Sequence, residues 1–533
     1  MDAKQLARGL MVAQKVLADV GRTNSQRALL KAACAAQPTP ANLRALLAAA
    51  ERDGDAAAAR DARARLDGKA AAAAPLVAET PAAPPGPMTL AEVVAPLHAP
   101  RGPMAYEPER DRVLYVLNNA LPLSSNGYAT RGQGMALGML DCGADLVCLT
   151  RPGFPFDLFK DDTPPYEVPA FSTVEGVRYD HVAAPTRKQL RNPADYLFHA
   201  AEALIPHIRR LRPAVVMAAS NHTNALPAAL AAHALGVPFV YEVRGFWEVT
   251  RLSREPGFDA TQAWRDQVFL ETEAARAADA VLTLTTPMRD LLVERGVAPD
   301  RIALVPNSCD PARFVPRRRD ADLAARYGIP QDVPVIGYIG SFVQYEGLED
   351  LARACAGLAA QGRDFRLLIV GSESAADGTT GPITAEIARI ARTQGLADRL
   401  IMPGRVPHDQ VEAHYSLIDI APFPRKPQPV TELVSPLKPL EALAMEKAVV
   451  VSSVRALAEM IRDGETGVVF AKGDSADMTR ALARLLDDAD LRARLGRAGR
   501  AWVEAERTWT RTARRGLDFM AQKGLLQGSE AAS

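Results

Sequence analysis

The segment that begins at Ser435 combines a hydroxyl group, a lysine and a glutamate at the start of a predicted helix. Ser435 can cap this helix, and Pro436 suits its first position because no N–H is needed there. The free N–H groups and positive dipole end of a helix that follows a parallel strand suit a pyrophosphate. Lys438 adds a full positive charge after Leu437, and Glu441 can accept hydrogen bonds from two ribose hydroxyls. These residues predict a site for a nucleotide-sugar.

The first half of the chain places further polar residues after strand-like apolar runs, where loops meet at one edge of a sheet. Gly127 lets the backbone come close to a ligand, with an ordinary turn as the alternative. His222 can contact the sugar of such a nucleotide-sugar, or an acceptor molecule that would receive the sugar, or else have a capping or packing role. Arg244 can bind a donor phosphate or an anionic acceptor, or else form a structural pair with Glu242 or Glu248.

These residues need parallel strands to bring them together, and apolar runs alternate with helical patterns in two sets. The first set comprises residues 113–117, 146–149, 215–218, 239–243 and 281–284. The second comprises residues 333–339, 367–370, 400–402, 418–422, 449–451 and 468–470. The pattern predicts two Rossmann-like, doubly wound α/β domains facing a cleft. Ligands in such sheets bind beyond the carboxyl ends of the strands, so the cleft is the expected site.

Five motifs in the right order resemble the retaining glycosyltransferases of family four, also called group 1 glycosyltransferases, which have the GT-B fold. One is the segment that contains Lys438 and Glu441. The others are a Pro-Asn-Gly-x-Asp-x-x-x-Phe-like strand exit at 305–314, a Leu-x-x-x-Gly strand end at 367–371, a Gly-x-Val turn at 404–406 and a Gly-x-x-Gly-x-x-x pattern at 464–470. The resemblance covers roughly residues 112–512. It implies an acceptor-side first domain and a donor-side second domain.

The chain departs from the family's pattern of cations. The resemblance implies an arginine and a lysine on the first loop of the second domain, where Ser341 and Glu346 stand. Lys438 and Arg405 are the predicted replacements, because both fall on loops at the same carboxyl edge of the sheet.

Two other family positions also differ. Of the family's two glutamates, Glu441 provides the second, whereas the first would fall on Leu433, one place after Glu432. The family often has a histidine where Arg244 stands.

The resemblance implies a metal-independent retaining glycosyltransferase of hexosyltransferase type. It would move a sugar from a nucleotide diphosphate-sugar to a hydroxyl of a glycan or lipid-linked acceptor, in cell-surface or exopolysaccharide synthesis. The predicted catalytic residues are Lys438, Arg244 and His222. The predicted donor-binding residues are Gly127, Ser341, Arg405, Ser435, Pro436, Leu437, Lys438 and Glu441.

No nucleophilic carboxylate is evident at the sugar, which favours a front-face mechanism over double displacement. Two alternatives stay open because the family's cations are missing. They are a catalytically silent nucleotide-sugar-binding scaffold and a nucleotide-sugar epimerase on the same fold.

Charge and composition argue against several other classes. The 63 basic and 63 acidic residues give a net charge of +0, so no bulk attraction to nucleic acid is expected. The five cysteines have no CxxC spacing and the histidines no metal spacing, so neither a metal nor a cofactor besides the donor substrate is predicted. No signal peptide and no apolar run of ~18–20 residues is evident. These features predict a cytoplasmic protein with at most peripheral contact at the inner membrane face.

The chain divides into five predicted parts. Residues 1–68 have helical spacing and would recruit a protein partner, and residues 69–110 read as an Ala/Pro-rich mobile linker. Residues 111–310 and 311–522 form the two Rossmann-like domains, and residues 523–533 form a tail.

Overall fold

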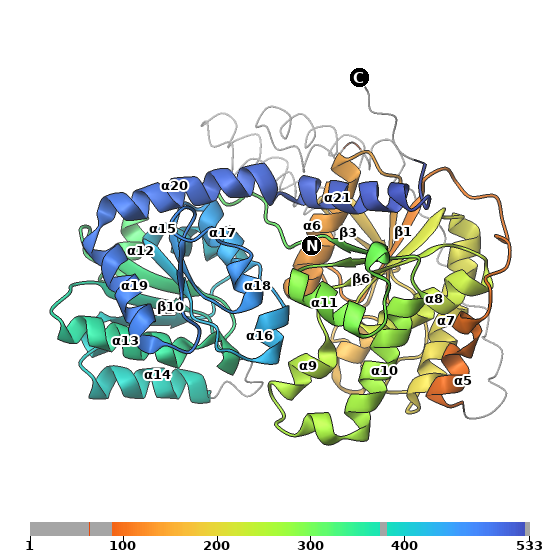
Figure 1. Cartoon of the computed structure of the whole chain (residues 1–533), viewed down its shortest axis with the longest axis horizontal. Coiled ribbons are helices and arrows are strands. Elements are labelled where there is room, and N and C mark those ends of the chain that lie inside the picture. Colours follow the sequence, from red (N-terminus) through yellow and green to blue (C-terminus); the bar gives the residue numbers. More distant parts are fainter. Residues whose placement is uncertain (1–62, 64–87, 374–380, 528–533) are drawn as a thin grey trace, which may run out of the picture.

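The computed structural model describes residue 63, residues 88–373 and residues 381–527 (Figure 1). Apart from residue 63, the predicted helical segment, residues 1–68, lies outside the described residues, as does the predicted linker up to residue 87. Of the predicted tail, the structure describes residues 523–527. None of the described helices has both the length and the apolar character needed to cross a membrane.

The first domain is built on an eight-stranded sheet in the order β3-β4-β2-β1-β5-β6-β7-β8. Its strands are β1 (Val113–Leu117), β2 (Leu146–Thr150), β3 (Phe171–Val174), β4 (Val177–Asp180), β5 (Val215–Ala219), β6 (Phe239–Val243), β7 (Ala280–Thr283) and β8 (Ile302–Leu304). All pairings are parallel except the β3–β4 hairpin. The five predicted strands are present. The hairpin was missed because polar and apolar residues are mixed in it, so no continuous apolar run marks it. β8 was not among the predicted strands, although it directly precedes the strand exit predicted at residues 305–314.

Alternate residues of these strands supply two cores on opposite faces of the sheet, as the pleat requires. Leu114 and Val116 of β1 pack with the helices at residues 193–211, 222–234 and 262–277, whereas Tyr115 of the same strand packs with the helix at residues 127–141. The helices of this domain are α5 (Leu90–Val94), α6 (Gly127–Asp141), α7 (Pro193–Leu211), α8 (His222–Ala234), α9 (Trp247–Leu252), α10 (Gln262–Ala277) and α11 (Thr286–Glu294).

The second domain has a six-stranded, fully parallel sheet in the order β11-β10-β9-β12-β13-β14. Its strands are β9 (Val335–Ile339), β10 (Arg366–Val370), β11 (Leu400–Gly404), β12 (Ile420–Phe423), β13 (Ala448–Ser452) and β14 (Val468–Phe470). All six were predicted. The helices are α12 (Ala321–Arg326), α13 (Leu348–Ala360), α14 (Pro382–Thr393), α15 (Val411–Leu417), α16 (Pro429–Leu433), α17 (Lys438–Ala444), α18 (Arg455–Ala458), α19 (Ser475–Asp487) and α20 (Ala489–Glu506).

The last helix, α21 (Trp509–Gln522), corrects the predicted domain boundary. It follows α20 but crosses to the first domain, where it lies along α6 (Figure 1). Ala513 and Met520 are fully buried in the core of that domain. A Cβ built at Gly134 of α6 would lie 2.2 Å from the Trp509 ring, so the helices pack closely only because glycine is there. The second domain therefore ends with α20 rather than at residue 522.

The predicted linker is also shorter than expected, because the described residues before Arg110 pack on the first domain. Val93 and Val94 of α5 are buried in the core that α7 shares. Arg101 donates to both carboxylate oxygens of Asp279, at 2.6 and 2.7 Å. Apolar side chains spaced along this stretch provide burial that offsets the entropy of ordering it.

Candidate active site

Lys438 is the first residue of α17, and its side chain lies against the backbone of Gly340, which follows β9. A Cβ built at Gly340 would lie 2.0 Å from Lys438 Cε and 2.9 Å from its Nζ. A Cβ at Gly371, after β10, would lie 1.8 Å from the Gly340 carbonyl oxygen. Two glycines thus allow a close approach that places a lysine at the carboxyl ends of β9 and β10, the binding edge of such sheets.

Ser435 does not cap α17, which corrects the prediction from the sequence. The N-cap residue is Leu437, and no side chain hydrogen-bonds to the cap, so Pro436 precedes the helix instead of starting it. Ser435 instead contacts Asn307 from the connection between the domains. Asn307 Nδ2 donates to the Ser435 carbonyl oxygen at 2.8 Å and lies 3.3 Å from its hydroxyl oxygen. The turn before Lys438 is therefore held from outside its own domain.

Glu441 lies in the first turn of α17 and accepts a hydrogen bond from the Tyr415 hydroxyl at 3.2 Å. Burial raises the pKa of its carboxyl group, and the opposing charges of Lys438 and Arg313 do not fully reverse this effect. A partly desolvated carboxylate beside a lysine can accept hydroxyl groups strongly, because few competing waters reach it.

Arg425, after β12, is a residue that the sequence analysis missed. It forms a buried ion pair with Glu346, in which Nη2 lies 2.6 Å from Glu346 Oε1 and Nε lies 3.3 Å from Oε2. Burial alone would raise the pKa of Glu346, but Arg425 and then Lys438 hold it below its ordinary value. At the position where the resemblance implies a lysine, the chain thus has Glu346 paired with an arginine that lies 79 residues away in the sequence. Such a pairing has no local sequence signal.

The other predicted donor-side residues are spread along the sheet edge. Ser341 is exposed directly after Gly340, and Arg405 is exposed after the edge strand β11. One strand, β10, separates β11 from β9, which puts Arg405 about 10 Å along the edge from the Lys438 loop. Glu432 forms an ion pair with Lys472, whose Nζ lies 2.5 Å from Glu432 Oε1.

Arg244, a predicted catalytic residue, lies in a buried cluster centred on Glu242. Its Nε donates to Glu242 at 2.9 Å, its Nη1 donates to the Tyr128 carbonyl oxygen at 2.7 Å, and its Nη2 donates to the Tyr115 hydroxyl. Arg131 donates to the other Glu242 oxygen at 2.9 Å. Burial would raise the pKa of Glu242, but Arg244 and Arg131 lower it to about 2. Every guanidinium nitrogen of Arg244 has a protein partner, which favours the structural pair kept as the alternative.

Gly127 starts α6, and a Cβ at this position would meet nothing within 4 Å. The helix is capped by Asn126, whose side chain accepts from Ala129 N at 3.0 Å. Gly127 is exposed, so the surface above the start of α6 is open to a ligand.

His222 starts α8 at the carboxyl end of β5 and is 7% exposed. Its Nδ1 lies 3.1 Å from Glu271 Oε1, and Tyr241 donates to the other Glu271 oxygen at 2.5 Å. If Nδ1 carries the proton, Nε2 is left as an acceptor. The ring lines a cavity of about 250 Å³ between the starts of α7, α8 and α10, with Arg187, Gln267 and mostly apolar neighbours.

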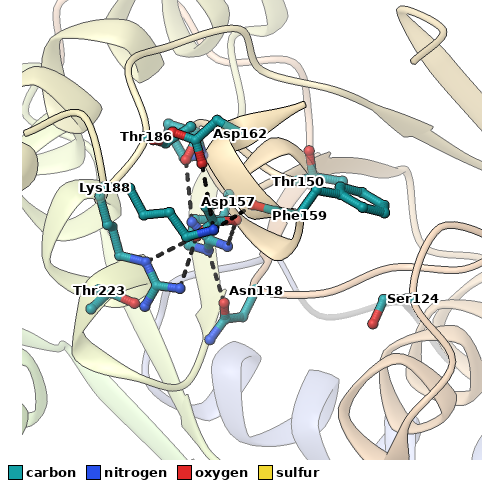
Figure 2. Close-up of polar contacts among 12 residues, drawn as sticks. Asn118, Ser124, Thr150, Asp157, Phe159, Asp162, Thr186, Lys188 and Thr223 are labelled. Carbon is teal, nitrogen blue, oxygen red and sulfur yellow. Dashed lines mark hydrogen bonds and ion pairs between the residues drawn. The ribbon is translucent and has the colours of Figure 1, made fainter. Parts of the chain in front are cut away.

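A buried polar cluster lies at the same edge of the first sheet (Figure 2). Asp157 accepts from Arg151 at 2.9 Å through one oxygen and from Arg187 at 2.8 Å through the other. Arg151 also donates to Asn118, the residue after β1, at 2.9 Å. Arg187 belongs both to this cluster and to the lining of the cavity beside His222, so the cluster fixes one wall of the cavity.

The first domain contacts the donor-side segment directly. The Thr285 hydroxyl donates to the Leu433 carbonyl oxygen at 2.6 Å. A Cβ at Gly245, after β6, would lie 3.5 Å from a methyl carbon of Val434. These contacts and the Asn307–Ser435 hydrogen bond hold the segment before Lys438 against the first domain.

Two family models match the chain. The model of the glycosyl transferases group 1 matches residues 320–502, and that of the glycosyl transferase 4-like domain matches residues 126–308.

Three relatives illustrate the similarity. The alpha-D-kanosaminyltransferase of Streptomyces kanamyceticus is 28% identical over 49% of this chain and 64% of its own length. The 2-deoxystreptamine glucosyltransferase of the same organism is 31% identical over 44% of this chain and 59% of its own length. The chain therefore spans less than two thirds of these two relatives. A D-inositol 3-phosphate glycosyltransferase of Stackebrandtia nassauensis is 28% identical over 75% of this chain and 89% of its length.

Solved structures show the same fold. A sucrose-phosphate synthase from Thermosynechococcus elongatus superposes with a TM-score of 0.61 at 19% identity, covering 78% of this chain and 99% of that one. Anabaena Alr3699/HepE, solved with UDP, gives a TM-score of 0.59 at 12% identity over 77% of this chain and 100% of that one. The predicted GT-B arrangement of two Rossmann-like domains is confirmed.

Proposed function

Because the chain belongs to the group 1 glycosyltransferases, we propose that it transfers a sugar from a nucleotide diphosphate-sugar to an acceptor hydroxyl. The observation that carries this proposal is the placement of Lys438 over Gly340, with Glu441 in the same helical turn. A cation and a carboxylate then share the binding edge of the second sheet, one suited to a diphosphate and the other to a ribose.

The donor would lie across this edge. Lys438 and the exposed Ser341 would bind the diphosphate, Glu441 would accept the ribose hydroxyls, and Arg405 would lie towards the end of the ligand that is further from Lys438. Anabaena Alr3699/HepE was solved with UDP and with UDP-glucose, which makes uridine donors the first to test.

Transfer would proceed with retention at the front face of the sugar. The barrier lies in breaking the anomeric C–O bond, where negative charge builds on the leaving diphosphate. Lys438 would stabilise that charge. The leaving phosphate would take the acceptor proton, so no separate base is required. The contacts of Thr285 and Gly245 with the donor segment would help to exclude water and limit hydrolysis of the donor.

The acceptor would enter from the first domain. The cavity beside His222 offers an imidazole nitrogen, the Arg187 guanidinium group and an apolar wall, which suits a hydroxyl-bearing glycan or lipid-linked molecule. A role in cell-surface or exopolysaccharide synthesis, at the cytoplasmic side of the membrane, would supply such acceptors.

A donor panel tests the proposal. Uridine, adenosine and guanosine diphosphates and their sugars are screened by thermal shift, since a ligand at about 100-fold its Kd adds about 2.7 kcal/mol of stability. Any stabilising donor is then followed by NMR. Slow hydrolysis, or transfer with retained anomeric configuration, supports the proposal. Binding without turnover would indicate a silent scaffold, and isomerisation without an acceptor would indicate an epimerase.

A further inference from the structure

Three loops meet around the buried pair Glu346–Arg425, which are 3% and 7% exposed. They are the loop after β9, the loop after β12 and the segment that leads to Lys438. A Cβ built at Gly347 would lie 2.2 Å from the Pro424 carbonyl oxygen, so the first two loops are in direct contact. The pair is therefore buried where these loops meet rather than exposed at the edge of the sheet.

Every guanidinium nitrogen of Arg425 has a protein partner. Nη2 and Nε donate to Glu346, and Nη1 donates at 2.9 Å to the carbonyl oxygen of Val434, four residues before Lys438. The carbonyl oxygen of Arg425 accepts a hydrogen bond from Ser452 at 2.7 Å, which ties the arginine to β13. The guanidinium group thus links the loop after β9 to the donor segment by fixed, planar hydrogen bonds.

The charge of Lys438 acts on the same carboxylate, because after Arg425 it is the next charge that lowers the Glu346 pKa. One buried carboxylate is thus bonded to Arg425 and is also stabilised by the charge of Lys438. A buried ion pair is weak evidence for stability, since desolvation offsets its Coulombic gain. Its consequence here is geometric, because Arg425 joins the loop after β9, which contains Gly340 and Glu346, to the segment that leads to Lys438.

We propose that Glu346 and Arg425 are positioning residues, which hold the segment before Lys438 so that its ammonium group reaches the donor diphosphate, without contacting the donor themselves. This inference rests on the proposed function of the site. It also explains how the chain can carry a glutamate on the first loop of the second domain. The Glu346 carboxylate, through Arg425, would position Lys438, which replaces the cation that the resemblance implies at this loop.

The test compares Glu346→Gln, Arg425→Met and the double variant with wild-type protein. The donor found by the panel is used to measure kcat, KM and the Kd for its nucleoside diphosphate. We expect kcat to fall about 10- to 100-fold in each single variant, because a displacement of about 1 Å can cost that much. KM should change less than threefold. The double variant should be no worse than either single one, since both break the same link.

Matched controls separate positioning from loss of folding. Lys426→Met changes the next cation, which pairs with Glu349 and Asp350 at 3.8 and 3.7 Å, and it should leave kcat unchanged. Arg425→Lys keeps a charge for Glu346 but cannot bond Val434 as well, so it should retain intermediate activity. Circular dichroism and melting curves confirm that each variant is folded.

The outcomes are distinguishable. If Arg425 were itself a donor ligand, Arg425→Met would weaken nucleotide binding, whereas Glu346→Gln would free the arginine and leave binding intact or tighter. That asymmetry, or additive losses in the double variant, would overturn the positioning role alone. A wild-type protein that binds no nucleoside diphosphate would overturn the proposed function and the positioning role together.

Discussion

The side chain of Lys438 lies so close to the backbone of Gly340 that Gly340 has no room for a methyl group. Gly340→Ala should therefore displace the lysine. We expect the transfer rate to fall by about 10²-fold, with the fold retained. Gly357→Ala is the matched control, because a Cβ there meets nothing within 4 Å in the middle of α13. The control should be neutral or slightly stabilising. Equal activity in both variants would mean that the position of Lys438 does not matter.

Lys438 itself should matter most when charge builds on the leaving diphosphate. Lys438→Met should lower kcat by roughly 10²–10³, with a smaller effect on donor affinity. Steady-state kinetics and the Kd of the nucleoside diphosphate separate these two effects. Normal turnover would place the diphosphate elsewhere along the sheet, with Arg405 the next residue to replace.

We expect Glu441 to strengthen nucleotide binding and to lower the stability of the folded protein. Glu441→Gln should weaken nucleotide binding at least tenfold, because hydroxyl groups bond more strongly to a charged acceptor.

The effect of pH on stability has a definite sign at Glu441. Burial raises the pKa of its carboxyl group in the folded protein, so the folded state holds this proton more tightly than the unfolded state. The wild-type protein therefore loses stability as pH rises from the unfolded pKa, about 4.3, through the raised folded value. Glu441→Gln should melt at a higher temperature than wild type at pH 7–8, and this gain should disappear near pH 4. A variant that melts lower at neutral pH would contradict the argument.

His222 should act on the acceptor rather than on the donor. His222→Gln removes the ring that lines the cavity, so the KM of the acceptor should rise about tenfold while hydrolysis of the donor in its absence stays unchanged. His233→Gln, at the other end of α8, is the control. A drop in donor hydrolysis for His222→Gln would move this residue to the donor side.

Two truncations test where the folded core begins. Removing residues 1–86 keeps every contact that α5 makes with the described residues from Met88 onwards, and it should leave the melting temperature within a few degrees of that of the full chain. Removing residues 1–107 also deletes Val93, Val94 and the Arg101–Asp279 pair. Each lost valine is worth about 1.5–3 kcal/mol, so the shorter chain should melt markedly lower or be insoluble. Equal melting temperatures would restore the linker as first predicted.

The sequence by itself determined five strands of the first sheet, all six strands of the second and the segment that carries Lys438 and Glu441. Continuous apolar runs mark fully buried parallel strands, and a strand followed by a loop and a helix puts that loop at the binding edge. It also pointed to the positions where the family's cations are absent. These features are local, and local patterns are what a single sequence records.

Only the tertiary structure showed which charged side chains are bonded to other residues of the protein. Arg244 directly follows β6, and each of its guanidinium nitrogens bonds to Glu242, Tyr128 or Tyr115. Lys438 starts α17, and its side chain instead lies against Gly340 at the edge of the second sheet. Glu346 meets an arginine 79 residues away, and α21 returns to a domain whose strands lie some two hundred residues or more earlier in the sequence. Such partners are chosen by packing and by the need to neutralise buried charge, which depend on distance in space rather than on spacing along the chain.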